Sequence, residues 1–191
     1  MAHNGHRLQY NAPVTLTFFF VSLAALLLGF ATGNTTTAVF FSVYRCPPSL
    51  LAVVRLFTHV LGHAGWEHFL SNMLLFLVVA PPMEEKYGSS LLLKGILFTA
   101  FVSGVLQCLF FPSSALLGAS GIVFMLIMLS SLSGMEAGRV PLTLVLVAAL
   151  YLGQQVYDMI FVEDNVANFM HIIGGLCGTG FGVAMLPRER Y

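Results

Sequence analysis

The chain of 191 residues is 58% hydrophobic, only 8% charged and has a formal net charge of zero. A soluble domain carries about a quarter charged residues, so this composition excludes an ordinary soluble protein and predicts one that faces largely lipid. The balanced charge argues against a nucleic-acid partner. Cys46, Cys108 and Cys177 are far apart and form neither a disulfide framework nor a CxxC motif.

The N-terminal part of the chain predicts one membrane span and a long loop. After the short polar segment 1–13, residues 14–31 carry no charge and are long enough to cross a bilayer. A cleaved signal peptide is the alternative, because Arg7 precedes the apolar stretch. The stretch is long for such a signal, and more spans follow, so we expect it to be retained. Residues 32–65 predict an interfacial or partly embedded loop, whose apolar piece 50–54 is too short to span.

The rest of the chain predicts five further spans and no separate soluble domain. They cover residues 66–83, ending at Pro81-Pro82, then 90–111, 117–133, 140–161 and 167–186. We therefore predict a single domain, 1–191, that is an all-α membrane protein: a polytopic bundle of six transmembrane helices.

The distribution of basic residues predicts the orientation of this bundle. One side collects most of them: Arg7, Lys86, Lys94, Arg139, Arg188 and Arg190. The other side holds Arg45 and Arg55 together with acidic residues near 158–164. By the positive-inside rule, we expect a multi-pass integral membrane protein of the plasma (inner) membrane with both termini in the cytoplasm.

Polar residues recur at one depth of the predicted bundle. Spans two, four and six each begin at the outer face, and their first turns hold His68 and Asn72, Ser120, and His171 respectively. Polar side chains at such depths are costly unless they face the bundle interior or water. Their shared depth predicts a polar, water-filled cavity that opens to the outer face.

Ser120 and His171 have the chemistry of a nucleophile and its base. A serine hydroxyl needs an adjacent base, and histidine titrates near neutrality. Gly118 and Gly121 flank the serine and would let the two helices approach. Glu67 is the one acidic residue at this depth, so we infer a dyad rather than a triad. Taken alone, the glycines and the serine are more typical of ordinary helix packing.

Small residues and donors complete the predicted site. Gly174, Gly178 and Gly182 recur on one face of the last span and could pack closely against the fourth. His68 and Asn72 are four residues apart, so they share a helix face and could both donate to a developing oxyanion. The alternative for this pair is a hydrogen bond between helices. The G-x-S-x-G elbow of soluble hydrolases does not match, because Ile122 replaces its last glycine.

Together these residues resemble the rhomboid family of intramembrane serine proteases, over roughly residues 50–185. The matching pieces are Gly118-Ala119-Ser120-Gly121, His171 with Gly174, His59-x3-His63-x4-His68-x3-Asn72, Arg55, Glu84 and Gly88. The resemblance implies a six-helix core with Ser120 as nucleophile, His171 as base and His68 and Asn72 as oxyanion stabilisers. It also implies supporting roles for Gly118, Gly121, Phe124 and His63, and a membrane-embedded loop at 32–65 anchored by Arg55.

The sequence departs from the family pattern at three places, none of which removes a catalytic group. Val54 replaces a frequent tryptophan, Phe124 replaces a frequent tyrosine that packs on the catalytic histidine, and Met170 replaces a small residue. Phenylalanine keeps the ring of that tyrosine, so stacking on His171 should survive.

The function expected from these observations is serine endopeptidase activity on single-span transmembrane substrates within the bilayer. Cleavage is expected near the extracytoplasmic boundary, without metal or other cofactor, and residues 140–161 with the loop holding Glu163 and Asp164 are the expected gate and cap. One alternative is a metal-binding membrane protein using His59, His63, His68 and His171. Another is a non-proteolytic rhomboid-like protein, channel or transporter.

Overall fold

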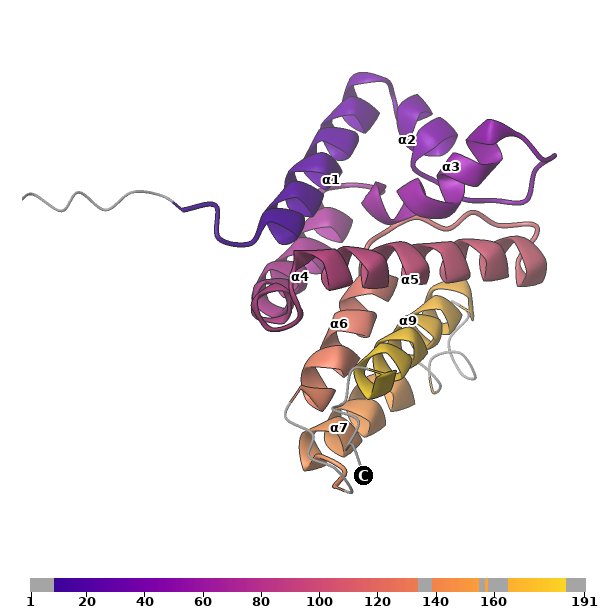
Figure 1. Cartoon of the computed structure of the whole chain (residues 1–191). Helices are drawn as coiled ribbons and strands as arrows, with labels where there is room; N and C mark the ends of the chain where they lie inside the picture. The colour runs from indigo at the N-terminus through magenta and orange to yellow at the C-terminus, as the bar shows by residue number, and fades with distance from the viewer. Residues whose placement is uncertain (1–8, 134–138, 155–156, 158–164, 185–191) are drawn as a thin grey trace, which may run out of the picture.

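In the computed structural model the chain folds into an arrangement of helices (Figure 1). The structure describes residues 9–133, 139–154, 157 and 165–184. Within these residues no strand forms, and an isolated bridge joins Val43 to Leu116. The all-α prediction is confirmed for this part of the chain. The helices are α1 Pro13–Ala31, α2 Thr35–Phe40, α3 Leu50–Thr58, the 3₁₀ turn η1 His59–Leu61, α4 Trp66–Tyr87, α5 Ser89–Phe110, α6 Ser120–Leu132, α7 Leu142–Val147, the π-helical turn η2 Ala148–Leu152 and α9 Asn165–Ala184.

Three described helices are long and apolar enough to cross a membrane, by length and composition: Pro13–Ala31, Ser89–Phe110 and Val166–Ala184. They coincide with predicted spans one, three and six. α6 is apolar but shorter, and α4 carries Glu67 near its start and charged residues near its end. The presence of all six spans stays a prediction.

The long helix α5 runs across the middle of the molecule in Figure 1, with α1, α2 and α3 on one side and α6, α7 and α9 on the other. The buried core lies where α1, α4, α5 and α6 meet, and it includes Phe18, Phe76, Ile96, Ile122 and Leu126. Side chains such as Leu74, Val78 and Phe98 are exposed on the outer surface of the helices. This distribution suits a bundle whose outer surface is solvated by lipid.

The loop between α1 and α4 is folded around Arg55, which is buried in α3. Its guanidinium donates from Nε to the Val39 carbonyl at 2.6 Å, contacts Cys46 Sγ at 3.7 Å and lies 4.4 Å from the centre of the Tyr44 ring. Arg55 thus ties α3 to the segment that precedes it. The anchoring role implied by the resemblance agrees with these contacts.

The predicted end of the second span at Pro81-Pro82 is wrong, because α4 continues through both prolines to Tyr87. In lipid a helix is the cheapest way to satisfy backbone groups, so prolines are tolerated within a span. The continuation is also held by Glu84, whose buried carboxylate accepts hydrogen bonds from the Val14 and Thr15 N–H groups and from the Thr15 and Ser89 hydroxyls. A rule based on local sequence cannot include these partners, because Val14 and Thr15 are distant from Glu84 in the chain.

The fourth and fifth predicted spans also differ from the helices observed. The fourth helix begins at Ser120, not at residue 117, because Gly118 has φ +122° and cannot continue a helix. Over the fifth predicted span, 140–161, the chain is helical from Leu142 to residue 154, and the π-helical turn η2 lies within this helix. The remainder of that segment lies largely outside the described residues, as do Glu163 and Asp164.

Candidate active site

Ser120 is the first residue of α6, and the chain before it is fixed by backbone hydrogen bonds. Val43 and Leu116 exchange two bonds of 2.9 Å, and the Gly118 N–H donates to the His59 carbonyl at 3.0 Å. The first N–H groups of a helix have no intrahelical partner, and the helix dipole favours negative charge there. Ser120 therefore sits where an anion would be stabilised.

His171 lies against the first turns of α6. Its ring stacks on Phe124, four residues after Ser120, with ring centres 4.4 Å apart and planes 6° apart. Residues four apart share a helix face, so His171 covers the same face of α6 as Ser120. The stacking expected for Phe124 is confirmed.

Glycines allow α6 and α9 to pack backbone to backbone. A Cβ at Gly174 would collide with the Gly121 carbonyl, and one at Gly178 would collide with the Met125 carbonyl. The predicted packing ladder of small residues is confirmed. Met170, which precedes His171, is fully buried, and its carbonyl lies 3.6 Å from where a Cβ of Gly121 would be.

His68 and Asn72 reach the same region from the first turns of α4. A Cβ added at Gly118 would lie 2.7 Å from His68 Nε2 and 3.7 Å from Asn72 Nδ2, so both nitrogens border the residue two before Ser120. Asn72 is buried, and its Nδ2 has no hydrogen-bond partner among the described residues. A buried amide that lacks a partner is costly, and this one is available as a donor.

The tautomer of His68 follows from its other ring nitrogen. The Ala64 N–H donates to His68 Nδ1 at 3.4 Å, so Nδ1 carries a lone pair and Nε2 carries the hydrogen of the neutral ring. The hydrogen on Nε2 is therefore on the atom that borders Gly118. No sequence pattern indicated this backbone donor, since only its position in the turn before α4 makes it useful.

The other two histidines of the motif have different surroundings. His63 is buried beside His68, with ring centres 5.1 Å apart. His59 points elsewhere: its Nδ1 bonds the Arg55 carbonyl at 3.1 Å, and its Nε2 lies 3.3 Å from Ser103 Oγ on α5. Burial lowers the pKa of His59 and of His63 to about 4, so both are neutral near pH 7. Among the described residues no three His, Cys, Asp or Glu side chains gather as metal ligands would.

The comparison of the sequence with protein families agrees with this geometry. A model of the rhomboid domain matches residues 51–188, which is more than half of the chain. The chain belongs to the rhomboid family. As a rhomboid with long apolar helices, it is a multi-pass integral membrane protein.

Relatives of this rhomboid come from plants, an animal and bacteria. RHOMBOID-like protein 4 of Arabidopsis thaliana is 35% identical over 136 residues, covering 68% of this chain and 33% of the relative. Rhomboid protease GlpG of Pectobacterium atrosepticum is 26% identical over 89% of this chain and 62% of the relative. Putative rhomboid protease YdcA of Bacillus subtilis is 28% identical over 69% of this chain and 66% of the relative. The matches to RHOMBOID-like protein 4 and to Rhomboid-related protein 2 of Mus musculus span a third to a half of those proteins.

Buried polar residues that were not among the predicted site residues line one face of α5 in this rhomboid. Ser103 contacts His59, and the Gln107 side chain donates to the Phe111 and Ser114 carbonyls at 3.3 and 3.1 Å. Together with Thr99, they recur every fourth residue within an apolar span, which places them on one face of α5. This four-residue spacing in the sequence is the pattern that predicts a polar, inward-facing side of α5.

Proposed function

We propose that this rhomboid is an intramembrane serine endopeptidase with Ser120 as nucleophile and His171 as general base. The observation that carries the proposal is the convergence of two helices, α4 and α9, on the start of α6. His171 stacks on Phe124 one turn after Ser120, while His68 and Asn72 border Gly118 two residues before it. The relatives named as rhomboid proteases support the same activity.

In the proposed acylation, Ser120 Oγ attacks the scissile carbonyl carbon while His171 takes the hydroxyl proton. The tetrahedral intermediate collapses as His171 returns that proton to the leaving amine, which leaves an acyl-serine. Water then attacks the ester, again with His171 as base, and releases the new carboxylate and free Ser120. Phe124 holds the imidazole by stacking. The reaction needs no metal or other cofactor in this scheme.

The proposed oxyanion site consists of His68 Nε2–H, the Asn72 amide and the backbone N–H of Ser120. Preorganised donors of this kind stabilise charge that develops only in the transition state. The N-terminus of α6 adds its positive dipole end at the same point. Removal of one such donor typically costs ~10²–10³ in rate, so Asn72→Ala should slow turnover more than it weakens substrate affinity.

The proposed substrates are single-span membrane proteins. Helical peptide bonds are hydrogen-bonded and shielded, so we expect cleavage where Gly or Pro lets the substrate helix unwind. With six spans and both termini in the cytoplasm of a plasma (inner) membrane, the site would face outward and cut near the extracytoplasmic boundary. The glycines beside Ser120 favour a small side chain before the cut.

The proposed gate is α7 with η2. α7 buries none of its own side chains, and a π-helical turn follows it directly. Weakly packed segments open at low cost, and π-helical turns are frequent at functional sites. The acidic cap suggested by Glu163 and Asp164 lies outside the described residues.

The test is cleavage of a panel of single-span proteins by the purified chain, with cut sites read by mass spectrometry. Ser120→Ala and His171→Ala should each abolish cleavage with unchanged expression, and a fluorophosphonate should label the unaltered protein at Ser120. Normal proteolysis by Ser120→Ala would refute the assignment. Activity that EDTA abolishes, without fluorophosphonate labelling, would support the metal-binding alternative instead.

A further inference from the structure

The short turn before α4 holds a second histidine directly against the proposed oxyanion donor. His63 is 1% exposed, and its ring meets the His68 ring at 66° with centres 5.1 Å apart. It also meets the Phe69 ring at 82°, with centres 5.3 Å apart. Phe69 is itself 2% exposed and packs against Phe19. The His63 ring is thus wedged into the core at the base of His68.

The ring of His63 cannot turn freely. Its Nδ1–H donates to the Leu61 carbonyl at 3.2 Å, which fixes both its tautomer and its plane. Its Nε2 is buried and has no hydrogen-bond partner among the described residues. Burial, with a smaller contribution from His68, lowers the pKa of His63 to about 4. A neutral His63 ring places no positive charge beside His68. A charged His63 ring would repel a proton on His68.

The backbone hydrogen bond that sets the tautomer of His68 is weak, so packing of its ring adds needed support. The Ala64 N–H to Nδ1 contact is long, at 3.4 Å, and the opposite nitrogen borders the open side of Gly118. A rotation of the His68 side chain would aim the Nε2 hydrogen away from the oxyanion site. A change of tautomer would remove that hydrogen from Nε2. A donor contributes to catalysis only when it is preorganised.

We propose that His63 is a positioning residue for His68: its ring and the Ala64 N–H together hold His68 with Nε2–H aimed at the oxyanion site beside Gly118. The proposal rests on the proposed function of His68. In this proposal the ring of His63 has a packing role, and its nitrogens make no contact with the substrate. The contact between the two rings is therefore the part of His63 that acts on His68.

The matched variants are His63→Phe, which keeps a ring, and His63→Leu, which fills the space without one. The tautomer of His68 is read from the ¹⁵N shifts of histidine-labelled protein in detergent, with the His68 signal assigned by its loss in His68→Gln. We expect the Nε2–H tautomer in the unaltered protein and in His63→Phe, and a mixture of tautomers in His63→Leu. This measurement needs no substrate, so it stays informative even if the chain proves to cleave nothing.

Kinetics provide the second readout. His63→Leu should lower kcat by about 10-fold or more with KM little changed, less than the ~10²–10³ expected for removing a donor itself. His63→Phe should retain most activity. The proposal is overturned if His63→Leu keeps both the His68 tautomer and kcat, if His63→Phe is as defective as His63→Leu, or if His68 carries its hydrogen on Nδ1 in the unaltered protein.

Discussion

Gly118 determines how closely His68 and Asn72, the proposed oxyanion donors, can approach the start of α6. Its φ of +122° is a conformation that side chains rarely adopt, and its missing Cβ leaves room for His68 and Asn72. The same residue anchors the loop through its N–H bond to the His59 carbonyl. Backbone conformation and donor placement thus depend on one residue without a side chain.

Gly118→Ala should therefore slow cleavage strongly even though the substitution is small. The added methyl group would lie 2.7 Å from His68 Nε2, so it must displace the proposed donor as well as strain the backbone. We expect turnover to fall by about 10²-fold or more, the cost of losing an oxyanion donor. Cleavage rate and fluorophosphonate labelling are the measurements. Gly180→Ala is the control, because no atom lies within 4 Å of a Cβ there; equal activity of both variants would contradict the argument.

At the scale of elements, α6 and α9 form the tightest pair, and they lie side by side in Figure 1. The separation between these two helices sets the position of His171 over Phe124. Close packing of backbones needs small residues, because lipid supplies no hydrophobic force between helices. The glycine face of α9 is therefore required for the site as well as for stability.

Gly178→Leu should push α9 away from α6, since even a Cβ at this position collides with the Met125 carbonyl. We expect loss of cleavage together with a lower melting temperature in detergent. Gly180→Leu, on the exposed face of the same helix, should leave both nearly unchanged. Full activity and unchanged melting of Gly178→Leu would show that the close contact is not needed.

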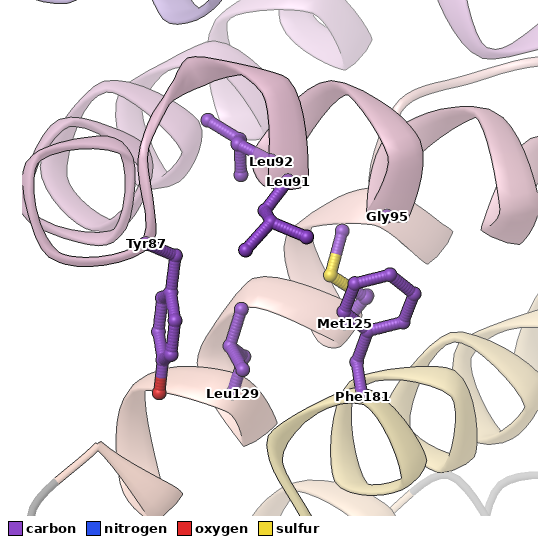
Figure 2. A pocket seen from close by; sticks show the side chains of 7 residues that line it. All are labelled: Tyr87, Leu91, Leu92, Gly95, Met125, Leu129 and Phe181. Atoms are coloured by element: carbon purple, nitrogen blue, oxygen red, sulfur yellow. The ribbon is translucent and has the colours of Figure 1, made fainter. Parts of the chain in front are cut away.

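A different glycine, Gly95 on α5, faces a small cavity rather than a backbone. Figure 2 shows this pocket between α5, α6 and α9, lined by Tyr87, Leu91, Leu92, Gly95, Met125, Leu129 and Phe181. Its free volume is about 10 Å³, room for no more than one water, and its lining is almost wholly apolar. The side chains that line such a space lose van der Waals contacts, and the space binds nothing polar.

Gly95→Ala should stabilise the protein. The new methyl would sit 3.7 Å from Met125 Cε and 3.7 Å from Phe181 Cε1, which are ordinary van der Waals distances. Alanine also favours the helix by about 0.5–1 kcal/mol over glycine. Thermal unfolding in detergent should show a melting temperature raised by a few degrees, with cleavage unchanged. A lowered melting temperature would mean that α5 and α9 cannot accommodate the methyl group.

At the scale of the whole molecule, two polar anchors join helices that are distant in sequence. At the end of the bundle that holds Ser120, the Val43–Leu116 bridge ties the loop before α4 to the chain before α6. At the far end of α4, Glu84 joins the start of α1 and the start of α5. The first anchor positions the site, and the second holds the helices that frame it.

Glu84→Ala should destabilise the whole bundle. It leaves the Val14 and Thr15 N–H groups and two hydroxyls without their acceptor, and each unsatisfied buried donor costs about 1–3 kcal/mol. Unfolding in a denaturing detergent should show a loss on the order of 3 kcal/mol or more. Glu84→Gln, which keeps one acceptor oxygen, should fall between. Glu85→Ala, at the exposed neighbour, is the control; an equal loss there would refute the role of Glu84.

The sequence by itself determined the all-α class, three of the spans and the candidate residues. Long apolar runs must become helices because lipid offers backbone groups no partners. The spacing of His68 and Asn72 places them on one helix face whatever packs against it. Likewise, the family resemblance at Phe124 implied that its ring would stack on His171, as it does.

Only the tertiary structure decided where elements begin, end and meet. α6 begins at Ser120 because Gly118 adopts a positive φ that is held by a bond to His59, and α4 passes its prolines because Glu84 finds partners on α1 and α5. His59 and His63, four apart in one motif, have different surroundings because the first lies in a 3₁₀ turn and the second in the loop that follows it. These outcomes depend on contacts between residues distant in sequence, and such contacts leave no periodic signal in the chain.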